Sequence, residues 1–173
     1  MGLQLPNLDG RTRELMIEEL EADVAAGRLW LNPRLSSKGE ADFPGLLRQA
    51  MAERDEVWLG EALRTHGRVS STEFRRGPTG ARTMVRVPAT AAITIAEEEF
   101  ARYYARAVCR RAIEEGIPRV VIYRAKAGPT PGQEAQSEID AQWSLDALRA
   151  RREGDQTLRL PPGPNAELNV RLP

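Results

Sequence analysis

Residues 94–126, TIAEEEFARYYARAVCRRAIEEGIPRVVIYRAK, decide the fold because they join the strongest helical pattern of the chain to its clearest strand. Apolar residues recur at helical spacing from Ile95 onward, and the pattern ends at Gly116. Pro118 then leads into residues 119–124, an apolar and β-branched run that is typical of a buried strand. The helix carries apolar side chains over a wide face, which predicts that it packs on more than one side.

Two helical segments are expected before this unit. Residues 9–26 repeat apolar side chains at helical spacing, with Asp9 as the expected N-cap and Gly27 as the expected C-cap. Residues 28–42 contain proline, serine and glycine and predict a loop. Residues 42–67 form the second helical block, which Arg54 and Asp55 could divide into two shorter helices.

Residues 68–88 predict a β-hairpin with strands at 69–74 and 82–87 around a turn at 77–80. Five arginines against Glu73 alone give this segment a net charge of +4. Because side chains alternate between the two faces of a strand, several arginines should project together from one face. The candidate interaction residues are Arg68, Arg75, Arg76, Arg82 and Arg86.

The C-terminal part predicts a loop over residues 127–132, a helix over 133–152, and two strands at 158–160 and 168–172. The two strands would dock as an edge pair on the sheet or on a neighbouring molecule. We therefore expect one α+β domain with a small mixed or antiparallel sheet, a projecting hairpin and three to five helices. Its expected parts are a helical N-terminal part (1–67), a basic β-hairpin (68–88), a long helix plus central strand (94–126), and a C-terminal helix and strand pair (133–173).

The inventory of reactive side chains is small for a chain of 173 residues. One histidine, His66, and one cysteine, Cys109, exclude a four-ligand zinc site and an intrachain disulfide. We expect Cys109 to be a buried thiol within the long helix and His66 to lie at a helix end before Gly67. No phosphate-loop, dinucleotide-binding, hydrolase-elbow or calcium-loop motif occurs, so we expect no cofactor, no metal ligands and no catalytic residues.

The ends of the chain and its hydropathy favour a cytoplasmic protein. Residues 1–6 do not form a signal peptide, and no stretch approaches the ~18 apolar residues of a membrane span. We expect no membrane partner. If the protein is phage-derived, we expect it in the virion instead of the cytoplasm.

The net charge of zero conceals segregated charge. Six carboxylates against two arginines give residues 1–27 a net charge of −4, whereas residues 116–126 carry +3. We expect the N-terminal carboxylates to form a solvated helix face rather than an acid–base pair. Arginine supplies 23 of the 25 basic residues, a bias that phosphate or carboxylate binding would explain and that GC-rich codon usage would also produce.

Three functions fit these patterns. The first is a non-enzymatic structural or assembly protein, a subunit or adaptor of a larger complex, which associates with copies of itself or with other proteins through the basic hairpin and the terminal segments. A phage-derived particle would be one such complex. The second is a small nucleic-acid-binding protein that uses the same arginines. The third is a metal-dependent hydrolase, which would need folding to bring residues 97–99 and Asp140 together.

Overall fold

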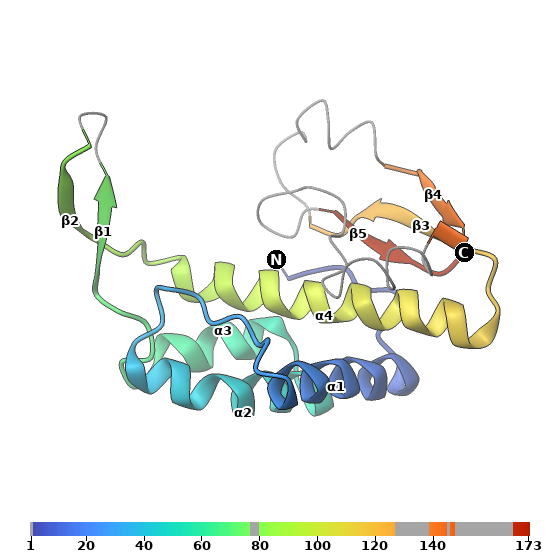
Figure 1. Ribbon diagram of the computed structural model, residues 1–173, viewed down its shortest axis with the longest axis horizontal. Helices are drawn as coiled ribbons and strands as arrows, with labels where there is room; N and C mark the ends of the chain where they lie inside the picture. The colour runs from blue at the N-terminus through green and yellow to red at the C-terminus, as the bar shows by residue number, and fades with distance from the viewer. Residues whose placement is uncertain (1, 77–79, 127–138, 145, 148–167) are drawn as a thin grey trace.

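A computed structural model describes residues 2–76, 80–126, 139–144, 146–147 and 168–173 of the chain. The long helix α4 (Ala91–Glu115) occupies the middle of the molecule. Three shorter helices pack on one side of it and a three-stranded sheet on the other, so that α4 separates two layers (Figure 1). Over the described residues this is a single compact α+β fold, in which the helices α1–α4 accompany two small antiparallel sheets.

Helix α4 is buried around much of its circumference, as its wide apolar face predicts. Phe100, Tyr103, Tyr104 and Val108 are all fully buried. The helix ends at Gly116, which adopts a left-handed conformation with φ of 66°. It begins three residues before the predicted Thr94, because Ala91 and Ala92 also pack into the core and extend the buried face.

The helical layer consists of α1 (Gly10–Ala25), α2 (Ser37–Glu53) and α3 (Glu56–Arg64). Asp9 caps α1 by accepting the Thr12 amide at 3.0 Å, as predicted. Helix α2 begins about five residues before the predicted start, because Ser36 accepts the Gly39 amide at 3.1 Å and caps it. Asp55 accepts the Trp58 amide at 2.7 Å, so the predicted break after α2 is confirmed.

The central sheet has the order β4-β3-β5 with both pairings antiparallel. Strand β3 (Arg119–Arg124) is the predicted central strand, and β5 (Leu168–Arg171) confirms the last predicted strand and docks on it. The helix predicted over residues 133–152 is wrong at β4 (Gln142–Ser144), which pairs with β3. Asp140 has a φ of 68°, and its amide donates to the Ile122 carbonyl at 2.9 Å, which turns the chain onto the edge of the sheet. The predicted strand at 158–160 lies outside the described residues.

Strands β1 (Thr72–Arg76) and β2 (Arg82–Arg86) form the second sheet and extend away from the helices (Figure 1). They pair antiparallel from Thr72–Arg86 to Arg76–Arg82. The first strand starts three residues later than predicted, because Val69 forms an isolated bridge with Leu35 instead. We call residues 72–86 the β1–β2 arm.

Candidate functional site

Residues 67–73 lead from α3 into the β1–β2 arm, and we call them its base. The segment just before α2 and the first turn of α2 hold this base in place. Arg34 donates to both carboxylate oxygens of Glu73, at 2.6 and 3.1 Å. The amide of Ser36 donates to the Arg68 carbonyl at 2.9 Å, and the hydroxyl of Ser36 donates to the Gly67 carbonyl at 2.7 Å. A Cβ added at Gly39 would overlap the Arg68 carbonyl oxygen, so the start of α2 and the base of the arm are in direct backbone contact. The arm is therefore fixed at its base.

The two faces of the β1–β2 arm differ in chemistry. Alternation along both strands places Thr72, Phe74, Arg76, Arg82, Met84 and Arg86 on one face, which we call the front face. Phe74 and Met84 lie opposite one another and remain 65% and 58% exposed. The Arg82 guanidinium lies 6.0 Å from the centre of the Phe74 ring. The front face thus combines two exposed apolar side chains with arginines on both sides of them.

The back face of the arm carries the acidic residue of the segment. The hydrogen bond from Arg34 lowers the pKa of Glu73 below its usual range, and Arg75 on the same strand, 3.0 Å away, adds to this effect. Glu73 therefore stays ionised as part of the base of the arm. It is not available to neutralise the arginines of the front face.

The predicted interaction residues do not form one set. Among the described residues, no carboxylate forms an ion pair with Arg76, Arg82 or Arg86, and all three are exposed. Arg75 is exposed but pairs with Glu73. Arg68 lies outside both strands, where its guanidinium donates to Asp42 Oδ2 at 2.7 Å and to the Ala62 carbonyl at 2.8 Å, so it joins α2 to the end of α3.

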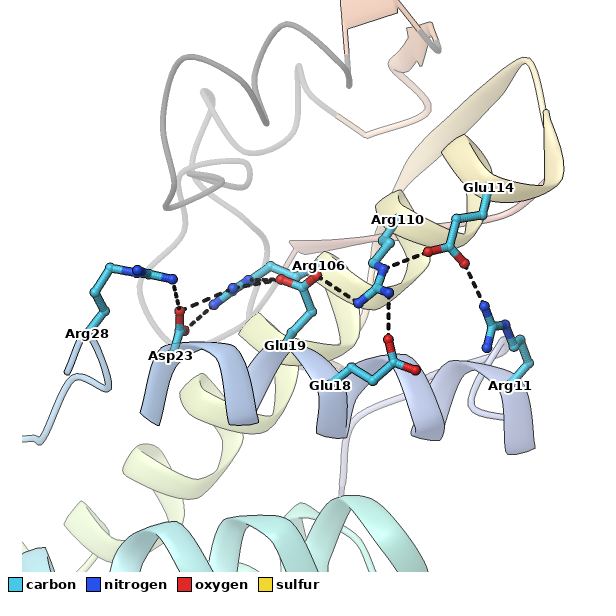
Figure 2. Close-up of polar contacts among 8 residues, drawn as sticks. All are labelled: Arg11, Glu18, Glu19, Asp23, Arg28, Arg106, Arg110 and Glu114. Atoms are coloured by element: carbon cyan, nitrogen blue, oxygen red, sulfur yellow. Dashed lines mark hydrogen bonds and ion pairs between the residues drawn. The ribbon is translucent and has the colours of Figure 1, made fainter. Parts of the chain in front are cut away.

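The six acidic side chains of residues 1–27 were expected on a solvated face. This is wrong for Glu19 and Asp23, which are buried against α4, whereas the other four are exposed. Figure 2 shows Arg106 and Arg110 of α4 directed at the carboxylates of α1. Arg106 donates to Glu19 at 2.7 Å and to Asp23 at 2.5 Å, and Arg110 donates to Glu18 at 2.5 Å. Each of the six acidic residues in 1–27 forms an ion pair within the chain: Asp9, Glu14, Glu18, Glu19, Glu21 and Asp23.

Arg106, Glu19 and Asp23 form the buried centre of these contacts. Burial by itself raises the pKa of Asp23, but the hydrogen bond and charge of Arg106 outweigh it, and the pKa lies below its usual range. Burial raises the pKa of Tyr103, whose hydroxyl donates to Asp23 at 3.0 Å. The signal in the sequence was the spacing of four between Glu19 and Asp23 and between Arg106 and Arg110, which puts complementary charges on facing helix stripes.

The carboxylates proposed for a hydrolase are not brought together. Glu97 pairs with Lys126, and Glu99 pairs with Arg102. Asp140 lies in the turn before β4. Within the described parts of the chain, no group of three His, Cys, Asp or Glu residues could hold a metal ion.

The single histidine and the single cysteine lie where the sequence predicts. His66 is exposed just after α3, with a φ of 58°, and Cys109 is buried in α4. A hollow of about 690 Å³ lies between the N-terminal segment and the α2–α3 junction. There Glu56 accepts the Leu3 amide at 2.6 Å, and Arg13 donates to the Met51 carbonyl at 2.7 Å. The first bond holds the N-terminal segment against α3, and the second joins α1 to α2.

Comparison with known proteins adds no assignment to these observations. No protein-family model, curated protein or solved structure matches the chain. Of the helices that the structure describes, none has the length and apolar character needed to cross a membrane.

Proposed function

We propose that the protein is a non-enzymatic structural or assembly protein, a subunit or adaptor that joins a larger complex through the β1–β2 arm. The complex is either a cellular assembly or a phage-derived particle. Arg76, Arg82 and Arg86, together with Phe74 and Met84, make the contact. Arg75 pairs with Glu73 on the back face and Arg68 pairs with Asp42, so neither makes the contact.

The observation that carries this proposal is the exposed apolar pair on an isolated ribbon. A two-stranded hairpin is marginally stable in water unless another element covers it. Here Phe74 and Met84 are exposed, and the arm extends away from the helices (Figure 1). Exposed apolar side chains with a polar rim mark interaction surfaces. Covering them with a partner would stabilise both the arm and the complex.

The charge distribution favours a different protein over a second copy as the partner. Head-to-tail association would need the carboxylates of α1 to receive the arm of the next copy. Those carboxylates are already paired with Arg11, Arg28, Arg48, Arg106, Arg110 and Arg111 of the same chain. The C-terminal strand β5 is likewise paired with β3 of its own chain. Within the described parts of the chain, the arm therefore fits a partner better than these two segments do.

Photo-cross-linking in the cells that contain the protein tests this proposal. A benzophenone amino acid is placed at Met84 on the arm or, as a matched control, at Ala52, which is exposed on α2. We expect protein cross-links from Met84 that survive nuclease treatment and are weakened by R82E/R86E. Protein cross-links that are no stronger from Met84 than from Ala52 would overturn the proposal.

The second candidate, nucleic-acid binding, is favoured by one observation: arginines and an exposed aromatic ring share the front face. Bases stack on such rings, and phosphates bind arginines. The same cross-linking experiment separates the two candidates. Cross-links from Met84 that nuclease destroys would support nucleic-acid binding and would contradict a protein partner.

A further inference from the structure

The outer edge of β2 presents backbone groups that are free to pair. The Val87 amide donates to the Ser71 carbonyl at 3.0 Å, which makes residues 71 and 87 a hydrogen-bonded pair. Because the two kinds of pair alternate in an antiparallel ladder, the pairs Phe74–Met84 and Thr72–Arg86 are not hydrogen-bonded. The amides and carbonyls of Arg82, Met84 and Arg86 therefore point away from β1. In the part of the chain that the structure describes, no other strand pairs with β2.

The same three residues also place their side chains on the front face. A strand added along β2 would have every second side chain directly opposite Arg82, Met84 and Arg86. The preferred neighbours of these residues are a carboxylate, an apolar side chain and a carboxylate. A segment with that alternation would complete the ladder, cover Met84 and neutralise both arginines at once.

A second copy of β2 does not meet this requirement. Antiparallel pairing of two β2 strands about Met84 puts Arg82 of each copy opposite Arg86 of the other. Parallel pairing in register puts each arginine beside its own counterpart. Like charges directly opposite one another destabilise a ladder, and charged side chains at an edge protect it against pairing with copies of itself.

We infer that the outer edge of β2 binds an extended acidic segment of another protein, with a carboxylate, an apolar side chain and a second carboxylate at alternate positions. The inference rests on the proposed function and names the chemistry of its partner. The segment adds a third strand to the arm. Its backbone bonds to Arg82, Met84 and Arg86, and its carboxylates pair with the two guanidinium groups.

A peptide titration of the whole chain tests this inference. The probe is the blocked peptide Ser-Glu-Thr-Leu-Thr-Glu-Ser, and amide resonances of the ¹⁵N-labelled protein report its binding. We expect the shifts to concentrate on Arg82, Met84 and Arg86. A peptide with lysine in place of both glutamates should bind at least about tenfold more weakly. N-methylation of the leucine, which removes one ladder hydrogen bond, should weaken binding by a similar factor.

Variants of the arm give matched controls. R86E should lose about tenfold in affinity for the acidic peptide, whereas R75E, the same change on the back face, should lose less than about threefold. The lysine peptide should recover binding to R82E/R86E. Retained chemical-shift dispersion in each variant shows that the fold is intact.

The outcomes separate this inference from the proposed function. Equal binding of acidic and lysine peptides, or of methylated and unmethylated peptides, would overturn strand addition even where cross-links from Met84 identify a protein. Equal losses in R75E and R86E would do the same. If a single-stranded DNA of about 20 nucleotides shifts the same amides and the acidic peptide does not, the edge binds nucleic acid instead.

Discussion

Arg106 lies buried between two carboxylates of α1 and is held by hydrogen bonds to both Glu19 and Asp23. Removing one partner from a buried ion pair leaves an uncompensated charge in a poorly solvated place. In R106M the two carboxylates would face one another without the guanidinium. The charge of Arg106 is therefore expected to contribute substantially to the free energy of unfolding.

We predict that R106M lowers the free energy of unfolding by about 3 kcal/mol or more. The matched control is R48M, because the Arg48–Glu21 pair is close to half exposed and such pairs contribute about 1 kcal/mol or less. Urea denaturation followed by circular dichroism measures both. Losses of similar size in the two variants would show that the buried ion pairs of Arg106 stabilise the fold no more than an exposed pair does.

Glu99 provides a prediction about pH. It is 3% exposed, and burial raises its pKa from an ordinary 4.5 to about 7, although the charge of Arg102 opposes this. Below pH 4.5 the group is protonated in both states, so its stabilising contribution is complete. As the pH rises toward 7 the unfolded chain ionises first, and the folded state loses up to about 3 kcal/mol from this group.

We therefore expect E99Q to gain stability relative to the wild type as the pH is raised from 5 to 8. E53Q is the control, since Glu53 is exposed at the end of α2. Urea denaturation at several pH values gives the comparison. A difference between E99Q and wild type that is constant with pH would contradict the raised pKa of Glu99.

At the scale of elements, α2 shows how the start of one helix holds the segment that leads into the arm. Gly39 in its first turn meets the Arg68 carbonyl, whereas Gly45 further along has open space around its Cα. A Cβ at the first position forces the helix away from the base of the arm. A Cβ at position 45 meets no neighbour and only reduces the conformational freedom of the unfolded backbone.

Opposite effects of the same substitution are therefore expected within α2. G45A should raise the free energy of unfolding by up to about 1 kcal/mol, and G39A should lower it. Thermal unfolding of the two variants checks the sign. Equal stabilisation by both would mean that the contact between α2 and Arg68 is loose.

Strand β4 illustrates an element that local pattern does not identify. Ile139 and Trp143 are four apart, which fits a helix, and both pack against the core. The competing signal is tertiary, because β3 offers a free edge and the Ile122 amide donates to the Ala141 carbonyl at 2.9 Å. Backbone pairing with β3, whose partner residues lie 21 to 25 positions earlier in the chain, overrides the helical spacing.

At the scale of the whole molecule, segregated charge acts inside the chain. The −4 of the first 27 residues is offset by arginines of α4 and α2, not by a neighbour. Of the described residues, Arg76, Arg82 and Arg86 of the arm are exposed and form no such ion pair. The arm and residues 1–27 therefore do not present two free surfaces of opposite charge.

We predict that the isolated chain scatters light as a single copy of 19.2 kDa at both low and high salt. Salt between about 50 and 500 mM screens exposed charges, so a head-to-tail contact would show as a larger mass at the low end. Size-exclusion chromatography with light scattering makes the measurement. A dimer that dissociates as the salt concentration rises would contradict this prediction and would support head-to-tail association between copies.

The sequence alone determined the helix–strand unit of α4 and β3, the cap at Asp9, the break at Arg54 and Asp55, and the arginine-bearing hairpin. These depend on periodicity and capping within a few residues. Only the tertiary structure decided which charges are free. Arg106 meets Glu19 across 87 residues and Arg68 meets Asp42 across 26, and neither partner is fixed until the helix faces meet. The candidate site consists of those arginines of the arm, Arg76, Arg82 and Arg86, for which this packing supplies no carboxylate among the described residues.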